Sequence, residues 1–223
     1  MSIPAAHPGT DGRADELAEL VRSVRRLVAA TVLNRAPASD LTTFTRELDD
    51  VAERLEAHVP DPPPHITETG GAGEIGDAFE MSERMPFDVV VGRYTPLALP
   101  VEIEFDGDRA IGRARFATPY EGPPGCVHGA VIAATFDIVL TAANMIARAP
   151  GLTVSLSTRY RRPTRLHVES RFEAWVERVD ERRTYTHGRI VQGDVVTVES
   201  EGIFARLQAG TTGEVAGGSR SAS

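Results

Sequence analysis

The sequence predicts an α+β fold in which an antiparallel sheet wraps around one long central helix. Three observations carry this prediction. The run from Gly129 to Ala147 has the length of a helix and is hydrophobic nearly all round, so other elements must surround it. Two segments before it and four after it alternate apolar and polar residues, as strands do. A sheet that curls over the helix buries the helix and the apolar face of the strands against each other.

The expected strands follow in chain order. Residues 101–105 and 109–116 flank an Asp-Gly pair at 106–107, which predicts a hairpin. Its apolar positions are Val101, Ile103, Phe105, Ile111 and Phe116. After the helix come residues 152–160, 166–179, 184–192 and 195–207, with Gly193 and Asp194 as the last tight turn. A curled sheet wraps only part of a helix, so we expect a second copy to cover the rest in an obligate dimer.

A helical arm is predicted at residues 13–58, before this domain. Two stretches, 13–34 and 39–58, place apolar residues at helical spacing, and Ser39 or Asp40 is the expected cap of the second. These apolar faces need a partner, either the main domain or another subunit. The remaining boundaries are a Pro/Gly linker at 59–79, the sheet domain at 80–207, and disordered ends at 1–12 and 208–223.

Composition narrows the function class. The formal charge of −8 over 223 residues disfavours nucleic acid and anionic membranes as main partners. The single cysteine, Cys126, excludes an internal disulfide and fits a reducing cytosol. No signal-peptide core opens the chain, and polar residues interrupt every long apolar run. We therefore expect a soluble, cytoplasmic protein without a membrane span. The six scattered histidines suggest no metal site, and phosphate-binding glycine motifs are absent.

Asp137 is the one charged side chain between Gly129 and Ala147. An unpaired buried carboxylate costs several kcal/mol. Asp137 is therefore hydrogen-bonded or paired, exposed to a cavity, or engaged in chemistry.

The stretch YEGPPGCVHGAVIAATFD, with the element order, resembles the hotdog-fold acyl-CoA thioesterases of the PaaI-like branch, in the 4-hydroxybenzoyl-CoA thioesterase superfamily. The family pattern is approximately Y-x-G-P-P-G-x-V-H-G-G, with an Asp nine residues after the His. His128 and Asp137 fit that spacing, and residues 92–100 resemble the family's entry segment. The resemblance covers residues 80–207. Ala130 replaces the usual second glycine, and Thr95 replaces an asparagine.

The resemblance implies metal- and cofactor-independent hydrolysis of acyl-CoA to free acid and coenzyme A by a homodimer or dimer of dimers. Asp137 would be the nucleophile or the general base, facing His128 of the other subunit. Unpaired N–H groups near Gly129 and Ala130 suit an oxyanion contact. The family often has Ser or Thr sixteen residues after the Asp, where Thr153 stands. Alternation puts Thr153 on the face opposite Leu152, Val154 and Leu156, where it could position water.

Other candidate site residues also have purely structural interpretations. Arg159, Arg161 and Arg162 form a basic cluster that either contacts the phosphates of coenzyme A or simply protects a solvated sheet edge. His128 could act only as a helix cap. A thiol dyad of Cys126 and His128 would be poorly held in a loop.

Two rival functions stay open at this point. The first is an enoyl-thioester hydratase or dehydratase, although its D-x-N-P-x-H type motif is missing. The second is a non-enzymatic acyl-CoA-binding domain whose helical arm docks a partner.

Overall fold

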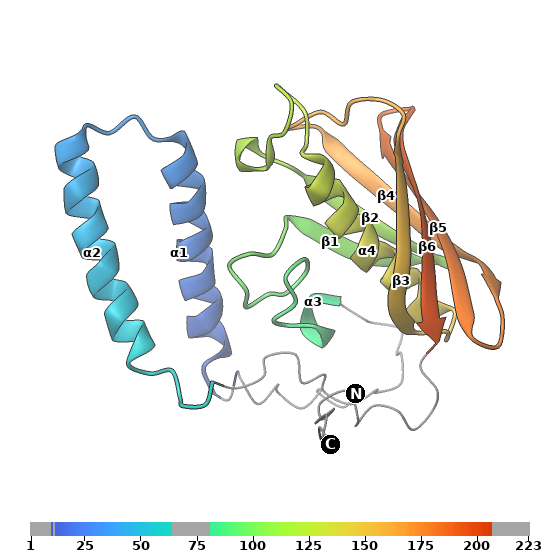
Figure 1. Cartoon of the computed structure of the whole chain (residues 1–223), viewed down its shortest axis with the longest axis horizontal. Coiled ribbons are helices and arrows are strands. Elements are labelled where there is room, and N and C mark those ends of the chain that lie inside the picture. The colour runs from blue at the N-terminus through green and yellow to red at the C-terminus, as the bar shows by residue number, and fades with distance from the viewer. Residues whose placement is uncertain (1–9, 11, 64–80, 207–223) are drawn as a thin grey trace, which may run out of the picture.

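A computed structural model describes residues 10, 12–63 and 81–206 (Figure 1). Apart from residues 10, 12 and 59–63, the predicted linker and the predicted disordered ends lie outside these residues. The arm consists of α1 (Ala14–Leu33) and α2 (Ala38–Glu56), followed after the gap by the short α3 (Met81–Arg84).

Six antiparallel strands form one sheet, which curls around the helix α4 (Gly129–Ile146). In chain order they are β1 (Val101–Asp106), β2 (Arg109–Arg115), β3 (Gly151–Tyr160), β4 (Glu169–Val179), β5 (Arg183–Gln192) and β6 (Val195–Arg206). Their spatial order is β1-β2-β4-β5-β6-β3, so β3 is an edge strand although it lies in the middle of the sequence. The short 3-10 turn η2 (Thr118–Tyr120) precedes α4. The predicted α+β class and element order are confirmed.

The core lies between α4 and the concave face of the sheet. Phe136, Val139 and Leu140 of α4 have no exposed surface. They pack in one core with fully buried side chains that precede or follow the helix in the sequence, namely Phe116, Phe172, Ile190, Val198 and Phe204. Each large apolar side chain buried in this way contributes roughly 1.5–3 kcal/mol relative to exposure.

Two glycines let α4 come close to the sheet. A Cβ atom on Gly188 would lie 3.1 Å from a Phe136 ring carbon and 3.2 Å from a Leu140 methyl. A Cβ atom on Gly202 would lie 3.0 Å from the other Leu140 methyl. Larger side chains at these two positions would push α4 away from the sheet.

We predict that Gly188→Val lowers the free energy of unfolding by about 1–3 kcal/mol, the usual cost of overpacking a filled core. Glu201→Val, on the exposed face of the neighbouring strand, is the matched control and should change stability by less than about 0.5 kcal/mol. Urea unfolding followed by circular dichroism measures both. Equal stability of the two variants would contradict this packing.

α4 alone among the described helices has the length and hydropathy of a membrane span, with a mean hydropathy of 1.7 over 18 residues. A core helix has the same composition, and half of these residues are buried within the fold. The helix is therefore weak evidence for a membrane segment.

The arm contacts the sheet domain through α1. Val21 is buried, and Arg25 donates from Nη2 to the carbonyls of Gly92 (3.0 Å) and Thr95 (2.7 Å), in the segment that leads into β1. By contrast, α2 has no buried residue. Figure 1 shows the arm standing on the α4 side of the sheet.

The expected cap of α2 at Ser39 or Asp40 is wrong. The N-cap is Pro37, whose extended backbone (φ −66°, ψ 157°) leads directly into the helix, and no side chain caps the helix start. Because the proline ring already sets a φ that suits the turn into a helix, α2 begins at Ala38 without a polar cap.

Candidate active site

Asp137 lies half-buried on the side of α4 that the sheet leaves open. Its Oδ1 accepts a hydrogen bond from the Thr153 hydroxyl at 2.8 Å. Thr153 belongs to β3, the strand at the edge of the sheet, which runs beside α4. The structure therefore brings two of the predicted site residues together within one chain, at the open edge of the sheet.

A β-bulge places Thr153 against the helix. The pairing of β3 with β6 shifts between Thr153, opposite Phe204, and Ser155, opposite Ile203. Leu156 then lies opposite Gly202, so Thr153 and Leu156 share the inner face. The expectation that Thr153 faces away from Leu156 is wrong for this reason. Leu152 and Val154 do point elsewhere, and they are 58% and 56% exposed.

His128 is the N-cap of α4. Its Nδ1 accepts the backbone N–H of Ala130 at 3.0 Å, and its own backbone N–H donates to the carbonyl of Tyr120 at 2.8 Å. Because Nδ1 is the acceptor, Nε2 carries the proton of the neutral imidazole. His128 therefore presents an N–H donor on an exposed ring while its other nitrogen fixes the helix start.

The two N–H groups expected as an oxyanion contact differ in availability. The N–H of Ala130 is used by the His128 cap. No acceptor for the N–H of Gly129 occurs among the residues that the structure describes. Gly129 thus offers the free donor at the positive end of the helix dipole.

Tyr160 is a site residue that the sequence reasoning missed. Its hydroxyl donates to the carbonyl of Gly129 at 2.8 Å and so fixes the first peptide of α4. Burial raises the pKa of Tyr160, which keeps this hydroxyl protonated as a donor. Tyr160 lies opposite Val198, on the same inner face of β3 as Thr153. Strand alternation past the bulge was the only signal that could have placed it there.

The site therefore has two halves on each chain. Nine residues of helix separate His128 from Asp137, which is about 13.5 Å of rise. One half comprises Asp137 and Thr153, and the other comprises His128, Gly129 and Tyr160. A small substrate group cannot touch both halves of one chain.

The predicted arginine cluster does not converge on either half. Arg161 pairs with Glu199 (Nε to Oε2, 2.8 Å), and strand alternation turns Arg159 and Arg161 to the face opposite Tyr160. Arg162 lies with Arg165 at a shallow pocket of about 530 Å³ near the β5–β6 turn.

The geometry supports neither a Cys126–His128 thiol dyad nor a metal site among the described residues. The Cys126 thiol is directed to the Pro124 carbonyl (3.6 Å) and lies 3.9 Å from Arg165 Nη1, so its two contacts lead away from His128. The described part of the chain contains no group of three or more His, Cys, Asp or Glu residues that could hold a metal ion.

Comparison with known proteins identifies the family. The thioesterase superfamily model matches residues 124–199, from the loop before α4 into β6. A crystal structure of a thioesterase superfamily protein is 31% identical, with a TM-score of 0.71, and the match covers 91% of this chain and 97% of that one. The chain belongs to the thioesterase superfamily. Its fold is the hotdog fold, as the resemblance implied.

Coverage of 91% also shows that this thioesterase superfamily relative shares the arm, because the sheet domain alone is too short to supply it. More distant solved structures match about half of this chain. A mutant of the phenylacetic acid degradation protein PaaI from Thermus thermophilus is 18% identical (TM-score 0.46, covering 49% of this chain and 95% of that one). Zebra fish thioesterase superfamily member 2 is 15% identical (TM-score 0.46, covering 48% and 82%). A search among curated proteins found no significant match.

We predict that Thr153→Val lowers kcat/KM for thioester hydrolysis about tenfold, because it removes the hydroxyl that holds Asp137 and keeps the side-chain shape. Thr153→Ser, which retains the hydroxyl, is the matched control and should stay close to the wild-type value. Steady-state kinetics on one thioester substrate measures both. A Thr153→Val enzyme as fast as wild type would show that the hydrogen bond has no part in the reaction.

We predict that Tyr160→Phe lowers kcat about three- to tenfold with little change in KM, since it frees the first peptide of α4 that the hydroxyl fixes. The same change at Tyr185, whose ring lies against Arg178, should leave kcat unchanged. If both variants lose activity equally, a general effect of losing a tyrosine hydroxyl explains the result better than the contact with Gly129.

Proposed function

We propose that this protein is an acyl-CoA thioesterase that hydrolyses the thioester to free acid and coenzyme A. The observation that carries the proposal is the Asp137 carboxylate, held by Thr153 at 2.8 Å on the open side of an otherwise apolar helix. A carboxylate kept there without a cationic partner among the described residues has a chemical use, because a purely structural position would favour an apolar residue.

The geometry leaves Asp137 free to act in either expected role. Thr153 occupies Oδ1, so Oδ2 is available to attack the thioester carbonyl or to take a proton from water. In the second case the water oxygen bonds to the carbonyl carbon, the carbon–sulfur bond breaks, and the coenzyme A thiolate takes up a proton. In both cases negative charge develops on the carbonyl oxygen and needs a donor.

A second subunit supplies that donor in our proposal. β3 is a ten-residue strand at the edge of the sheet, and its outer side pairs with no described strand. Its Leu152 and Val154 are exposed. An exposed apolar edge of this length is a site for pairing with another chain. Antiparallel pairing of two β3 strands about a two-fold axis places two α4 helices side by side. Asp137 of one copy then faces the α4 start of the other, with its Gly129 N–H and His128 Nε2–H.

The nucleotide part of coenzyme A needs cations outside this site. Arg159 and Arg162 are exposed, whereas Arg161 is paired with Glu199. We assign the phosphate contacts to Arg159 and Arg162, because a free guanidinium binds phosphate in a bidentate manner.

The test is release of free coenzyme A from acyl-CoAs between acetyl and palmitoyl chain lengths, by wild type and by Asp137→Asn. We predict hydrolysis that peaks at one chain length and falls at least about 100-fold in Asp137→Asn. Asp108→Asn, in the exposed β1–β2 turn, is the matched control and should remain fully active. Turnover of Asp137→Asn at the wild-type rate would remove Asp137 from the mechanism, and tight binding without release by wild type would favour an acyl-CoA-binding domain.

A further inference from the structure

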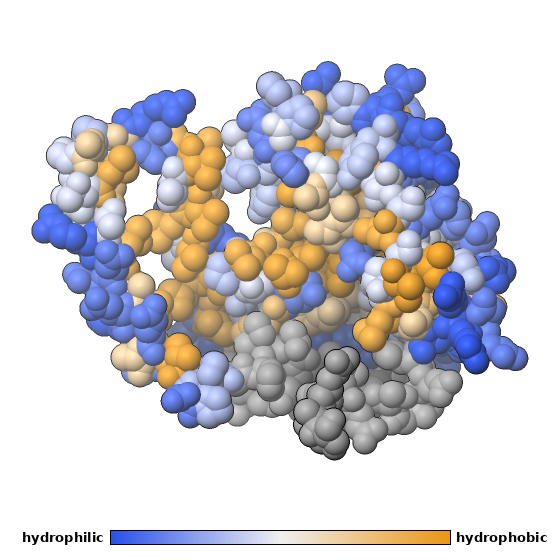
Figure 2. All heavy atoms as spheres, viewed as in Figure 1, coloured by the Kyte–Doolittle hydropathy of each residue, from blue (hydrophilic) through white to orange (hydrophobic). Residues whose placement is uncertain are grey.

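The arm exposes a large apolar surface. Ten large apolar side chains of α1 and α2 are between 37% and 57% exposed: Leu20, Leu27, Val28, Val32, Leu33, Leu41, Phe44, Leu48, Val51 and Leu55. Figure 2 shows their residues gathering along α1 and α2 on the sides that face each other. Apolar side chains exposed singly are normal on a soluble protein, but so many gathered on two facing helices mark an interaction surface.

The arm does not cover this surface by itself, because its two helices do not pack along their length. Asn34 (ψ 161°) and Pro37 (ψ 157°) both have extended backbone, so the connection holds the helices apart. Val21 and Arg25 tie α1 to the sheet domain at the same time. The hairpin is therefore held open, with both apolar faces available to another molecule.

The charge of the arm argues against a lipid surface as the occupant. α2 carries six carboxylates and two arginines, and the whole chain has a net charge of −8. Helices that bind anionic bilayers carry Lys or Arg on the polar face instead. A gathered apolar face beside acidic side chains suits another protein chain better than an anionic bilayer.

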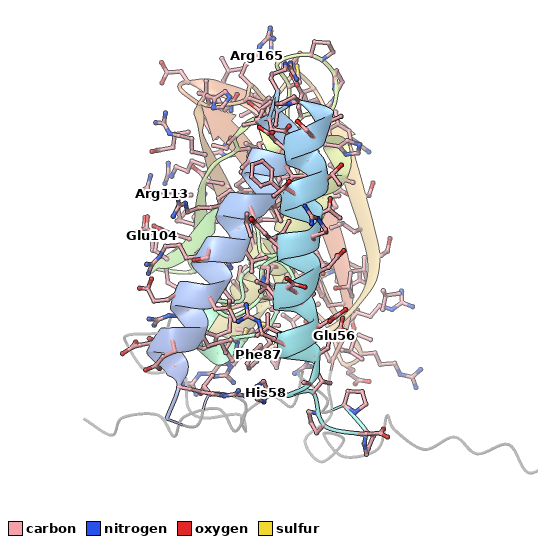
Figure 3. The ribbon with its side chains drawn as sticks, turned by 90° about the vertical axis from the view of Figure 1, so that its left-hand side faces the viewer. Glu56, His58, Phe87, Glu104, Arg113 and Arg165 are labelled. Carbon is pink, nitrogen blue, oxygen red and sulfur yellow. The ribbon has the colours of Figure 1, made fainter. Side chains whose placement is uncertain are left out.

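Symmetry favours a second copy of this chain. A two-fold axis that pairs two β3 edges runs perpendicular to the sheet, so it keeps both arms on the same side of the combined sheet. Figure 1 shows the arm on the α4 side, and in Figure 3 α2 lies on the β3 side of α1. The helix with no buried residue is thus the one nearer to the axis and to the other arm.

We propose that the apolar faces of α1 and α2 pack against the same faces of the arm of a second copy, as a helical bundle that adds to the β3 contact. This inference rests on the dimer of the proposed function. The bundle gives Leu41, Phe44, Leu48 and their neighbours a partner that residues 10, 12–63 and 81–206 of one chain do not supply. It also explains why a relative aligned over 97% of its length retains the arm.

The first test compares two substitutions on α2 by sedimentation equilibrium of the full chain. Leu48 lies in the middle of the apolar stripe, and Thr43 lies on the opposite side of the helix. We expect Leu48→Glu to raise the dimer dissociation constant at least about tenfold, as loss of a central apolar anchor does. Thr43→Glu should leave it unchanged. Equal dissociation constants for Leu48→Glu and wild type would overturn the inference.

The second test needs no substitution. Hydrogen exchange of wild type, measured above and below the dimer dissociation constant, should show α2 amides protected only in the dimer. Protection of β3 with rapid exchange of α2 in the dimer would overturn the arm contact and leave the proposed thioesterase intact. Protection of α2 only after addition of anionic vesicles would overturn it in favour of a lipid surface. Failure of the proposed function appears separately, as absence of coenzyme A release.

Discussion

The incomplete burial of α4 is the constraint on which the remaining structure depends. The sheet covers Phe136, Val139 and Leu140, and the close approach at Gly188 and Gly202 fixes the distance of the helix from the sheet. One side of α4 stays open, and within the described chain the edge strand β3 runs beside it. Asp137 lies there, and Thr153 of β3 supplies its hydrogen bond. The same open side therefore carries the carboxylate and the exposed strand edge, and it is the side on which we propose that a second copy docks.

Much of this arrangement could be predicted from local patterns. The run from Gly129 to Ala147 marks a helix that must be surrounded, and period-two segments around it mark the strands, so the α+β class followed from where apolar residues stand. The spacing of His128 and Asp137 pointed to the two halves of the site. Rise per residue along a helix already showed that these two side chains do not meet within one chain.

The parts that sequence reasoning missed depend on contacts between distant segments. The bulge at Val154 shifts the alternation of β3, and nothing in an apolar–polar pattern shows that one residue has been inserted. Tyr160 reaches Gly129 only because β3 crosses beside the start of α4. The N–H of Ala130 is occupied because the His128 ring turns back onto it. The helical pattern predicted the two helices of the arm. Their separation depends instead on the extended backbone at Asn34 and Pro37, which that pattern does not show.

The most direct measurement of the central claim mixes Asp137→Asn and His128→Ala chains, each of which we predict to be inactive alone. If each active site combines Asp137 of one chain with the α4 start of the other, mixing restores one intact site in every heterodimer. A statistical mixture should then recover about a quarter of the wild-type rate of coenzyme A release. If mixed dimers stay as inactive as the two parents, both residues act within one chain, and the account of a shared site is contradicted.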